Sequence, residues 1–273
     1  MNLADPATLQ RFLASQGIKA TKELGQHFLC SVDVVNAIVD RVSGCRGVLE
    51  IGPGPGVLTG PLAESAERVV AIELDGRMAQ ALAISAPIAE IVRLDALKVD
   101  LSALLDGLPS PRAVVSNLPY YITAPLVERI ARARANFDQA VLMMQREVAQ
   151  RIVAPPRSGE RGSLSVFLQA VFRIEVVAQV PASAFLPPPK VDSTVLALAP
   201  KPESAFEEAF FDFVRIGFAQ PRKTLANNLM AGLRLDREAV QALITAAGLA
   251  PLARAQELTE GEWVRLRGLA SQA

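Results

Sequence analysis

The stretch that decides the fold is "GVLEIGPGPGVLT" at residues 47–59. Its first five residues form a short, largely apolar run, which predicts a buried strand. Gly52, Gly54 and Gly56 then permit positive φ angles and let a ligand approach the backbone closely. The helix predicted to follow would direct its N-terminus toward that ligand. Such a turn is typical of nucleotide sites and also of plain strand-to-helix connections, so this stretch leaves both interpretations open.

Further along the chain, apolar runs of strand length alternate with helical patterns. This alternation is typical of parallel βαβ units and predicts a doubly wound α/β sheet. Helices are predicted at 6–17, 31–42 and 163–171, and strands at 47–51, 68–74, 91–96, 112–116, 139–145, 173–180 and 193–199.

The pattern changes near Pro200. After "PKPES" (200–204) only helical periodicity remains. We therefore predict two domains: residues 1–200, which hold the sheet and the glycine turn, and residues 201–273, which form a small helical domain.

The composition limits the classes of protein that the chain can represent. Its 273 residues are 51% hydrophobic, enough for one large core and a small second domain. Lys+Arg and Asp+Glu both number 28, so a strongly basic nucleic-acid binder is not indicated, and any RNA-binding surface must come from local clustering. Two cysteines, Cys30 and Cys45, and one histidine, His27, are too few for a disulfide framework or a zinc site. We predict no metal, and a soluble cytoplasmic protein, because the chain shows no signal pattern and no membrane-length apolar run.

Two carboxylates follow the strands next to the glycine turn. Glu73 lies at the end of the second predicted strand of the sheet, where a carboxylate can accept two hydrogen bonds from a ribose diol. Asp95, followed by Ala96, ends the third, where a carboxylate can accept a hydrogen bond from the amine of adenine. Together these strand ends predict one pocket. Taken singly, either acid is also explained as a helix N-cap or a solvated strand end, and both NAD and S-adenosylmethionine fit the pattern.

The residues at the end of the fourth predicted strand favour one of these two cofactors. It ends in "NLPY", the Asn/Asp-x-Pro-aromatic pattern of methyltransferases that act on the amino nitrogens of bases, for which hydride transfer has no use. We predict that the Asn117 side chain and the Leu118 carbonyl accept hydrogen bonds from the target amine. Pro119 makes the turn rigid, and Tyr120 offers a face on which a flipped base stacks. Tyr121 is expected to pack, and a plain Asx-turn is the structural alternative for Asn117.

Eight strings occur along the chain in one order: "LGQHFL" (24–29), "EIGPGPGVLT" (50–59), "AIELD" (71–75), "DAL" (95–97), "NLPYYIT" (117–123), "MMQREVAQRI" (143–152), "PASAFLPPPKVDSTV" (181–195) and "PRKTLANNL" (221–229). Together they resemble the bacterial 16S ribosomal RNA adenine dimethyltransferase family. The resemblance implies a class I, Rossmann-like methyltransferase domain, with a seven-stranded sheet that has one antiparallel strand, and a small C-terminal all-helical domain. It implies an enzyme that uses S-adenosylmethionine to dimethylate the N6 amines of two adjacent adenosines in the 3′-terminal hairpin of 16S rRNA.

The resemblance also implies roles for individual residues. Phe185 is similar to the family's second aromatic residue, which sandwiches the target base with Tyr120. Many members have Asn where His27 stands, and either side chain can hydrogen-bond the cofactor carboxylate. The implied cofactor-binding residues are Gln26, His27, Leu29, Gly52, Gly54, Glu73, Asp95, Ala96 and Asn117.

A local excess of positive charge indicates where RNA would bind. Residues 129–161 contain seven arginines and three acids, which predicts a phosphate-tracking face or, alternatively, an ordinary solvated helix surface. Arg222 and Lys223 add a second basic spot, where the family often has another Arg in place of Pro221. The neutral net charge favours a shaped partner, the small ribosomal subunit, over naked RNA, and the family suggests a monomer.

Three other hypotheses stay open at this point. The large-subunit rRNA adenine methyltransferases of the macrolide-resistance type share the glycine turn and the Asn-x-Pro-aromatic motif. A ribosome-assembly or transcription factor could keep the fold and bind nucleic acid with little catalysis. A dinucleotide-dependent oxidoreductase would use the glycine turn but not the "NLPY" turn.

Overall fold

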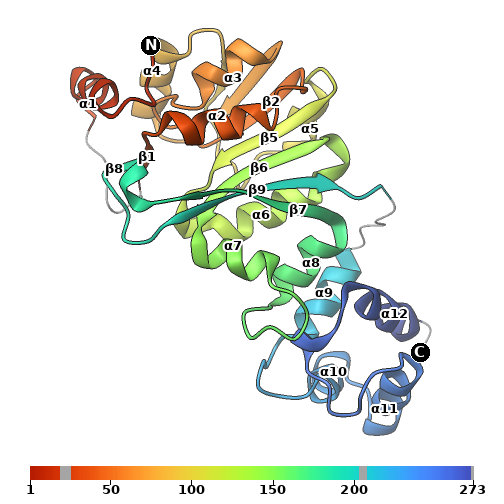
Figure 1. Ribbon diagram of the computed structural model, residues 1–273. Coiled ribbons are helices and arrows are strands. Elements are labelled where there is room, and N and C mark those ends of the chain that lie inside the picture. The colour runs from red at the N-terminus through yellow and green to blue at the C-terminus, as the bar shows by residue number, and fades with distance from the viewer. Residues whose placement is uncertain (19–25, 203–207, 272–273) are drawn as a thin grey trace. The chain divides into compact units, whose positions relative to one another are not determined.

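A mixed sheet forms the centre of the first of two units. In the computed structural model, which describes residues 1–18, 26–202 and 208–271, this sheet has seven strands in the order β4-β3-β2-β5-β6-β9-β7 (Figure 1). The five strands from β4 to β6 pair in parallel, and β9 pairs with β6 antiparallel. The strands are β2 (Gly47–Ile51), β3 (Arg68–Ile72), β4 (Glu90–Val92), β5 (Arg112–Asn117), β6 (Gln139–Gln145), β7 (Phe172–Val180) and β9 (Ser193–Pro200).

The central strands are almost wholly buried. All five residues of β2 are buried, and Val48 and Leu49 are 0% exposed. Strands of a parallel sheet are covered on both faces, which explains why these strands are continuous apolar runs in the sequence. The predicted doubly wound sheet with one antiparallel strand is therefore confirmed.

Two predicted strands are too long. The strand predicted at 91–96 ends at Val92, because the Leu94 amide donates back to the Val92 carbonyl at 3.1 Å and starts a turn. The strand predicted at 68–74 ends at Ile72. Glu73 and Asp95 consequently lie in the loops just after their strands, where side chains can point away from the sheet.

Helices cover the sheet and close the first unit. One buried cluster joins α1, α2 and α3 to strand residues such as Val48, Ala113 and Val141. Asp5 caps α1 by accepting from the Thr8 amide at 2.8 Å. The helices are α1 (Pro6–Ser15), α2 (Val32–Asp40), α3 (Thr59–Ser65), α4 (Gly76–Ser85), α5 (Leu101–Asp106) and α6 (Thr123–Arg132), followed by α7 (Arg146–Val153), which leads into the second unit.

A second, two-stranded sheet was not predicted from the sequence. It pairs β1 (Phe28–Leu29) with β8 (Phe185–Leu186) antiparallel, so that Leu29 lies opposite Phe185. These strands are two residues long and more than 150 positions apart, and no local pattern announces such a pair. The pairing brings the "QHFL" and "AFLPPP" segments together next to the main sheet; Leu24 and Gly25 of the first motif lie outside the described residues.

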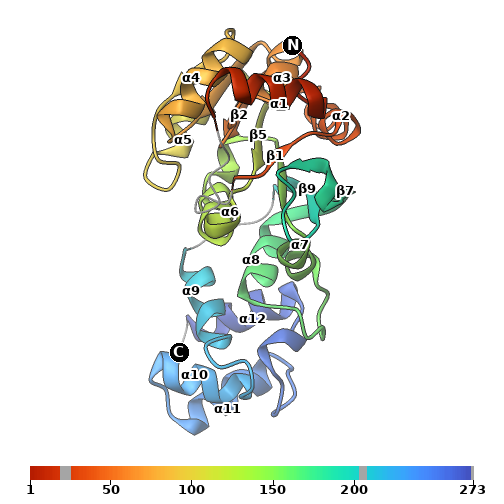
Figure 2. The same cartoon turned by 90° about the vertical axis from the view of Figure 1, so that its left-hand side faces the viewer.

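The second unit comprises residues 150–172 and 201–273. One border of this unit lies between Pro200 and Lys201, and the unit also includes residues 150–172, which the two-domain prediction placed with the sheet. The reason is packing: Phe167 of α8 lies against Phe211, with ring centroids 4.1 Å apart. The helices are α8 (Ser163–Val171), α9 (Glu208–Gly217), α10 (Leu225–Leu233), α11 (Arg237–Ala246) and α12 (Glu260–Ala270), of which α10, α11 and α12 follow one another in contact (Figures 1 and 2).

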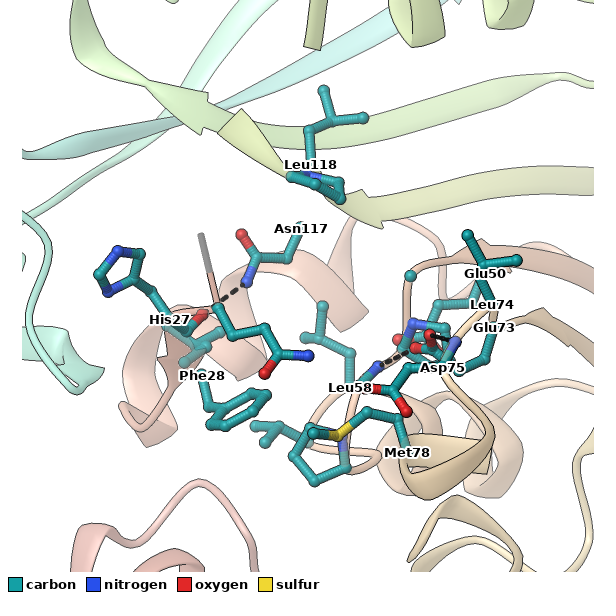
Figure 3. A pocket seen from close by; sticks show the side chains of 18 of the residues that line it. His27, Phe28, Glu50, Leu58, Glu73, Leu74, Asp75, Met78, Asn117 and Leu118 are labelled. Carbon is teal, nitrogen blue, oxygen red and sulfur yellow. Dashed lines mark hydrogen bonds between the residues drawn. The ribbon is translucent and has the colours of Figure 1, made fainter. Parts of the chain in front are cut away.

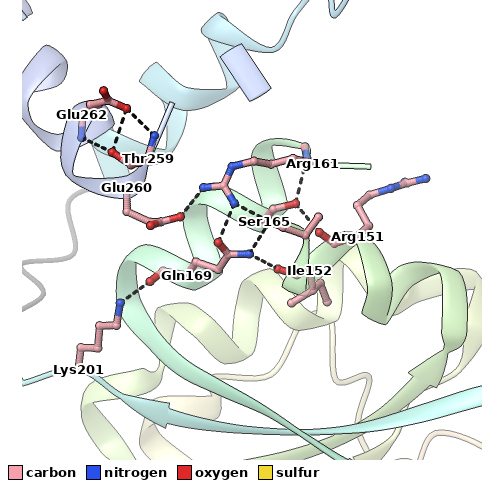
Figure 4. A network of polar contacts seen from close by, with 11 residues as sticks. Arg151, Ile152, Arg161, Ser165, Gln169, Lys201, Thr259, Glu260 and Glu262 are labelled. Atoms are coloured by element: carbon pink, nitrogen blue, oxygen red, sulfur yellow. Dashed lines mark hydrogen bonds and ion pairs between the residues drawn. The ribbon is translucent and has the colours of Figure 1, made fainter. Parts of the chain in front are cut away.

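Arg161 holds the start of this second unit together (Figure 4). Its guanidinium donates to the Ala154 carbonyl and to Gln169 Oε1, each at 2.7 Å, and pairs with Glu260 of α12. The Arg161 side chain is 0% exposed. Arg161 therefore cannot belong to the predicted phosphate-tracking face, because its guanidinium is buried and already paired with Glu260.

None of the helices in the described ranges has both the length and the apolar character that crossing a bilayer requires.

The packing of Trp263 yields a test of the second unit's core. A Cβ atom on Gly217 would lie 2.3 Å from the Trp263 ring, whereas one on Gly268 would meet nothing within 4 Å. We expect Gly217→Ala to destabilise the protein by about 1–3 kcal/mol through overpacking. Gly268→Ala, in the exposed interior of α12, should be neutral or stabilising by about 0.5–1 kcal/mol. Denaturant unfolding followed by the fluorescence of the single tryptophan measures both, and equal midpoints for the two variants would contradict this packing.

Candidate active site

An open cavity of about 320 Å³ lies in the first unit, where β2, β3 and β5 end (Figure 3). Ligands of open α/β sheets bind at this carboxyl edge, and the cavity falls within the usual size range of small-molecule sites. It is lined by Gln26, His27, Phe28, Leu29, Glu50, Gly52, Pro53, Gly54, Pro55, Val57, Leu58, Glu73, Leu74, Asp75, Met78, Asn117, Leu118, Pro119, Tyr120 and Tyr121.

The glycine turn forms one wall of the cavity. Gly52 has φ +68° and Gly54 has φ +56°, conformations that a side chain would strain. A Cβ atom on Gly54 would also approach the Phe28 ring to 3.5 Å. The predicted positive φ is observed at both positions and at Gly56 (φ +95°), whereas the approach of a ligand to this backbone stays a prediction.

Glu73 is held in place by this turn. Its two carboxylate oxygens accept hydrogen bonds from the Gly54 amide at 3.1 Å and from the Asp75 amide at 2.8 Å. Glu73 is 8% exposed, and burial raises the pKa of its carboxyl group, while these two backbone hydrogen bonds oppose the rise. A carboxylate oxygen accepts more than one hydrogen bond, so Glu73 can also receive the hydroxyls of a ligand.

Asp95 and Ala96 lie beyond β4 and are not among the residues that line the cavity. Asp95 accepts from the Leu97 amide at 2.9 Å, which closes a local turn after β4. The Ala96 carbonyl accepts from Arg129 at 3.2 Å, and Arg129 also bonds the Val99 carbonyl. This arginine thus braces a loop and does not extend a row of free cations.

The "NLPY" turn forms the opposite wall. Asn117 is the last residue of β5, and its side-chain nitrogen donates to the His27 carbonyl at 3.4 Å. The side-chain oxygen of Asn117 is the acceptor that the predicted chemistry needs. The Leu118 amide donates to the Met143 carbonyl at 2.9 Å, and the Thr123 hydroxyl donates to the Pro119 carbonyl at 3.1 Å. Both contacts fix the backbone of the turn.

Two rings lie side by side at this wall. The His27 and Tyr120 rings are stacked, with centroids 5.8 Å apart and planes inclined by 27°. The Pro187 carbonyl lies 2.8 Å from His27 Nδ1 and can only accept, so Nδ1 carries a proton. Tyr121 is 62% exposed at the mouth of the cavity, and the expectation that it packs is wrong.

Phe185 lies outside the cavity lining, so the role that the resemblance implies for its ring stays a prediction. It is 2% exposed, within the core cluster of the first unit, and it is not among the lining residues. Its apolar ring is buried because β8 pairs with β1, opposite Leu29, which does line the cavity. In this structure the ring that stands beside Tyr120 is that of His27.

Glu50 was not predicted from the sequence as a site residue. This residue of β2 lines the cavity, is 1% exposed, and has no described residue in hydrogen-bonding contact with its Oε2 atom. Burial raises the pKa of its carboxyl group to about 8, and the neighbouring Glu73 adds to the rise. An acidic residue inside an otherwise apolar strand is the signal that could have revealed it.

A metal centre finds no support in the described part of the chain, where no three His, Cys, Asp or Glu side chains gather suitably for an ion.

The mixed sheet, the glycine turn, Glu73 and the "NLPY" turn at one carboxyl edge define a Rossmann-like S-adenosylmethionine-dependent methyltransferase. The model of the family "Ribosomal RNA adenine dimethylase" matches residues 17–271, and the chain belongs to this family. The resemblance drawn from the sequence strings is thereby confirmed.

Named relatives and solved structures agree with this assignment. The chain is 39% identical to Ribosomal RNA small subunit methyltransferase A of Geobacillus thermodenitrificans, over 97% of this chain and 96% of the relative. It is also 39% identical to the protein of that name from Shouchella clausii, over 97% and 94%. A dimethyladenosine transferase from Plasmodium falciparum superposes with a TM-score of 0.71 at 27% identity, over 88% of this chain and 96% of that one. The 23S rRNA methyltransferase ErmE superposes with a TM-score of 0.65 at 29% identity, over 90% and 100%.

The raised pKa of Glu50 predicts a pH-dependent stability. Below about pH 4.5 the carboxyl is protonated whether the chain is folded or unfolded. Between about 4.5 and about 8 only the unfolded chain ionises readily, so the contribution of Glu50 to stability is lost as the pH rises. We expect Glu50→Gln to leave the Tm nearly unchanged at pH 5 and to raise it at pH 8.

Thermal unfolding at the two pH values measures this effect. Glu67→Gln is the matched control, since Arg46 lowers the pKa of this exposed carboxyl, and the variant should lose a little stability at pH 8. A Tm difference for Glu50→Gln that is the same at both pH values would show that Glu50 is not protonated in the folded protein.

Proposed function

We propose that the protein dimethylates the N6 amines of two adjacent adenosines in the 3′-terminal hairpin of 16S rRNA, within the small ribosomal subunit. The observation that carries this proposal is the "NLPY" turn at the end of β5, which places Asn117 and Tyr120 in one cavity with Glu73. The small-subunit assignment is supported by the names of the bacterial relatives, which are ribosomal RNA small subunit methyltransferases. A monomer that works in the cytoplasm, without a metal ion, completes the proposal.

The cavity offers matching groups for S-adenosylmethionine. Glu73 would accept the ribose hydroxyls, and the exposed side chain of Leu74 beside it offers an apolar surface for the adenine. The backbone of the turn from Gly52 to Gly54 lets the cofactor approach closely. Glu50, a buried acid whose Oε2 atom has no described hydrogen-bond partner, suits a molecule that carries positive charge.

The other end of the cavity would hold the methionine part. Gln26, His27 and Leu29 line that end, and we keep the roles that the resemblance assigns to them. Asp95 and Ala96 stay in the proposal as contacts of the adenine amine. Their loop follows β4, which pairs with β3 at the same edge of the sheet as Glu73.

The protein's part in the chemistry is alignment. The lone pair of an adenine amine is delocalised into the ring, so the amine is a poor nucleophile. When bound, S-adenosylmethionine supplies a methyl group on a positively charged sulfur that leaves readily. Asn117 and the Leu118 carbonyl would accept hydrogen bonds from the amine, draw it toward tetrahedral geometry and stabilise the charge that develops on nitrogen. Tyr120 would stack on the base, and the proton can leave to water after transfer.

The proposed RNA contacts are fewer than the row of arginines first predicted. Arg129 braces a loop, Arg146 pairs with Asp192 at 2.9 Å, and Arg161 is buried. In the second unit, Arg222 and Lys223 are exposed, and we propose them as phosphate contacts.

Buried Asn228 holds the loop that carries Arg222 and Lys223. Its side chain donates to the Gly217 carbonyl at 2.6 Å and accepts from the Gln220 amide at 3.2 Å. These bonds fix the backbone just before the two cations, which gives the "PRKTLANNL" string a structural role.

Methyl transfer to purified 30S subunits that lack the modification tests the function. We expect labelled dimethyladenosine at two adjacent positions near the 3′ end of 16S rRNA. Asn117→Ala should lower the rate by about 10²–10³-fold, the usual loss when one polar group aimed at developing charge is removed. Cofactor affinity, measured by calorimetry, controls for a general loss of the site.

The same assay separates the alternatives. Transfer to large-subunit RNA and not to 30S subunits would favour the activity named for the structural neighbour ErmE. Cofactor binding without transfer to either substrate would contradict catalysis and favour an assembly factor.

A further inference from the structure

The phenol of Tyr120 is held by a serine from a distant strand. The hydroxyl oxygens of Tyr120 and Ser193 lie 2.8 Å apart. Ser193 is the first residue of β9 and is 0% exposed, whereas Tyr120 belongs to the short helical turn after β5. The bond therefore joins the "NLPY" turn to the "PPPKVDSTV" segment across 73 positions of sequence.

We propose that Ser193 is a positioning residue that directs the ring of Tyr120 for stacking on the target base. This inference rests on the proposed function, because it assigns a role in the base site of that enzyme. It concerns a residue that lies outside the cavity lining and acts only through Tyr120.

Ser193 is itself rigidly placed. It pairs with Gln145, the last residue of β6. The preceding residue, Asp192, is bound on three sides: its carbonyl accepts from the Arg146 amide at 2.9 Å, and its carboxylate accepts from the Arg146 guanidinium at 2.9 Å and from the Ala182 amide at 3.0 Å. A serine on such a support can fix the position of a partner, since a site is only as precise as the residues behind it.

Two contacts together restrict the orientation of the Tyr120 ring. The phenol oxygen lies on the axis about which the ring flips, so the bond to Ser193 fixes where that axis points. The stacked imidazole of His27 then restricts the ring plane. The Pro187 carbonyl binds the His27 ring, so the segment 187–193 bonds both the Tyr120 phenol and the imidazole stacked on it.

A purely structural role for Ser193 makes different predictions. A buried hydroxyl needs a hydrogen-bond partner, and loss of that bond would then affect stability alone. A positioning role predicts a slower methyl transfer with unchanged cofactor affinity, because no cofactor contact is removed.

Single-turnover methylation of 30S subunits separates these roles. We expect Ser193→Ala and Tyr120→Phe each to slow transfer about tenfold, which corresponds to the loss of one hydrogen bond. The double variant should be no slower than either single variant, because both remove the same bond. Ser193→Thr, which keeps the hydroxyl, should restore most of the rate.

A spectroscopic measurement reports the bond without catalysis. The chain has two tyrosines, so ¹³C-labelled phenol carbons give two signals, which Tyr121→Phe assigns. Burial raises the pKa of Tyr120, and the bond from Ser193 opposes that rise. Ser193→Ala should therefore raise the titration midpoint of Tyr120 further.

The outcomes distinguish the two levels of the proposal. An active wild type whose rate equals that of Ser193→Ala would overturn the inference and leave the proposed function intact. A rate loss in Ser193→Ala that adds in full to the loss in Tyr120→Phe would also overturn it. A wild type that transfers no methyl group to 30S subunits would overturn the proposed function, and this inference with it.

Discussion

The pairing of β2 with β5 is the constraint on which the rest of the site depends. Ile51 lies opposite Ser116, and the buried Ser116 hydroxyl donates to the Ile51 carbonyl at 2.7 Å. The glycine turn begins directly after β2, and Asn117 is the last residue of β5. This register therefore places the glycine turn next to Asn117. A shift of one residue would turn every side chain of a strand to the opposite face and separate the two walls of the cavity.

The cavity is polar at a place where the fold would otherwise be apolar. Glu50 and Glu73 lie close enough that the charge of one raises the pKa of the other, and both are nearly buried. Such a pair costs stability in the absence of a ligand, because burial disfavours the charged form of an acid. Acids with perturbed pKa values in a cleft are typical of functional sites. A ligand that brings positive charge and hydroxyl groups would offset the cost of burying these two carboxyl groups.

The basic residues of the second unit serve two different purposes. Arg161 is buried and joins three segments of chain, whereas Arg222 and Lys223 stay exposed on a loop that Asn228 supports. Their local arrangement, and not the neutral net charge of the chain, determines what this unit can contact. Counting charges along the sequence could not separate the two uses, because burial depends on the helices that pack around each residue.

By itself, the sequence determined the parallel strands, the glycine turn, Glu73 and the "NLPY" turn, because each is encoded in a short run of neighbouring residues whose periodicity or backbone preference is local. Only the tertiary structure decided that β1 pairs with β8, that Phe185 is buried, that residues 150–172 join the helices and that Ser193 holds Tyr120. Each of these is a contact between residues far apart in the chain. Such contacts are selected by packing and hydrogen bonding in the whole fold, which no local pattern contains.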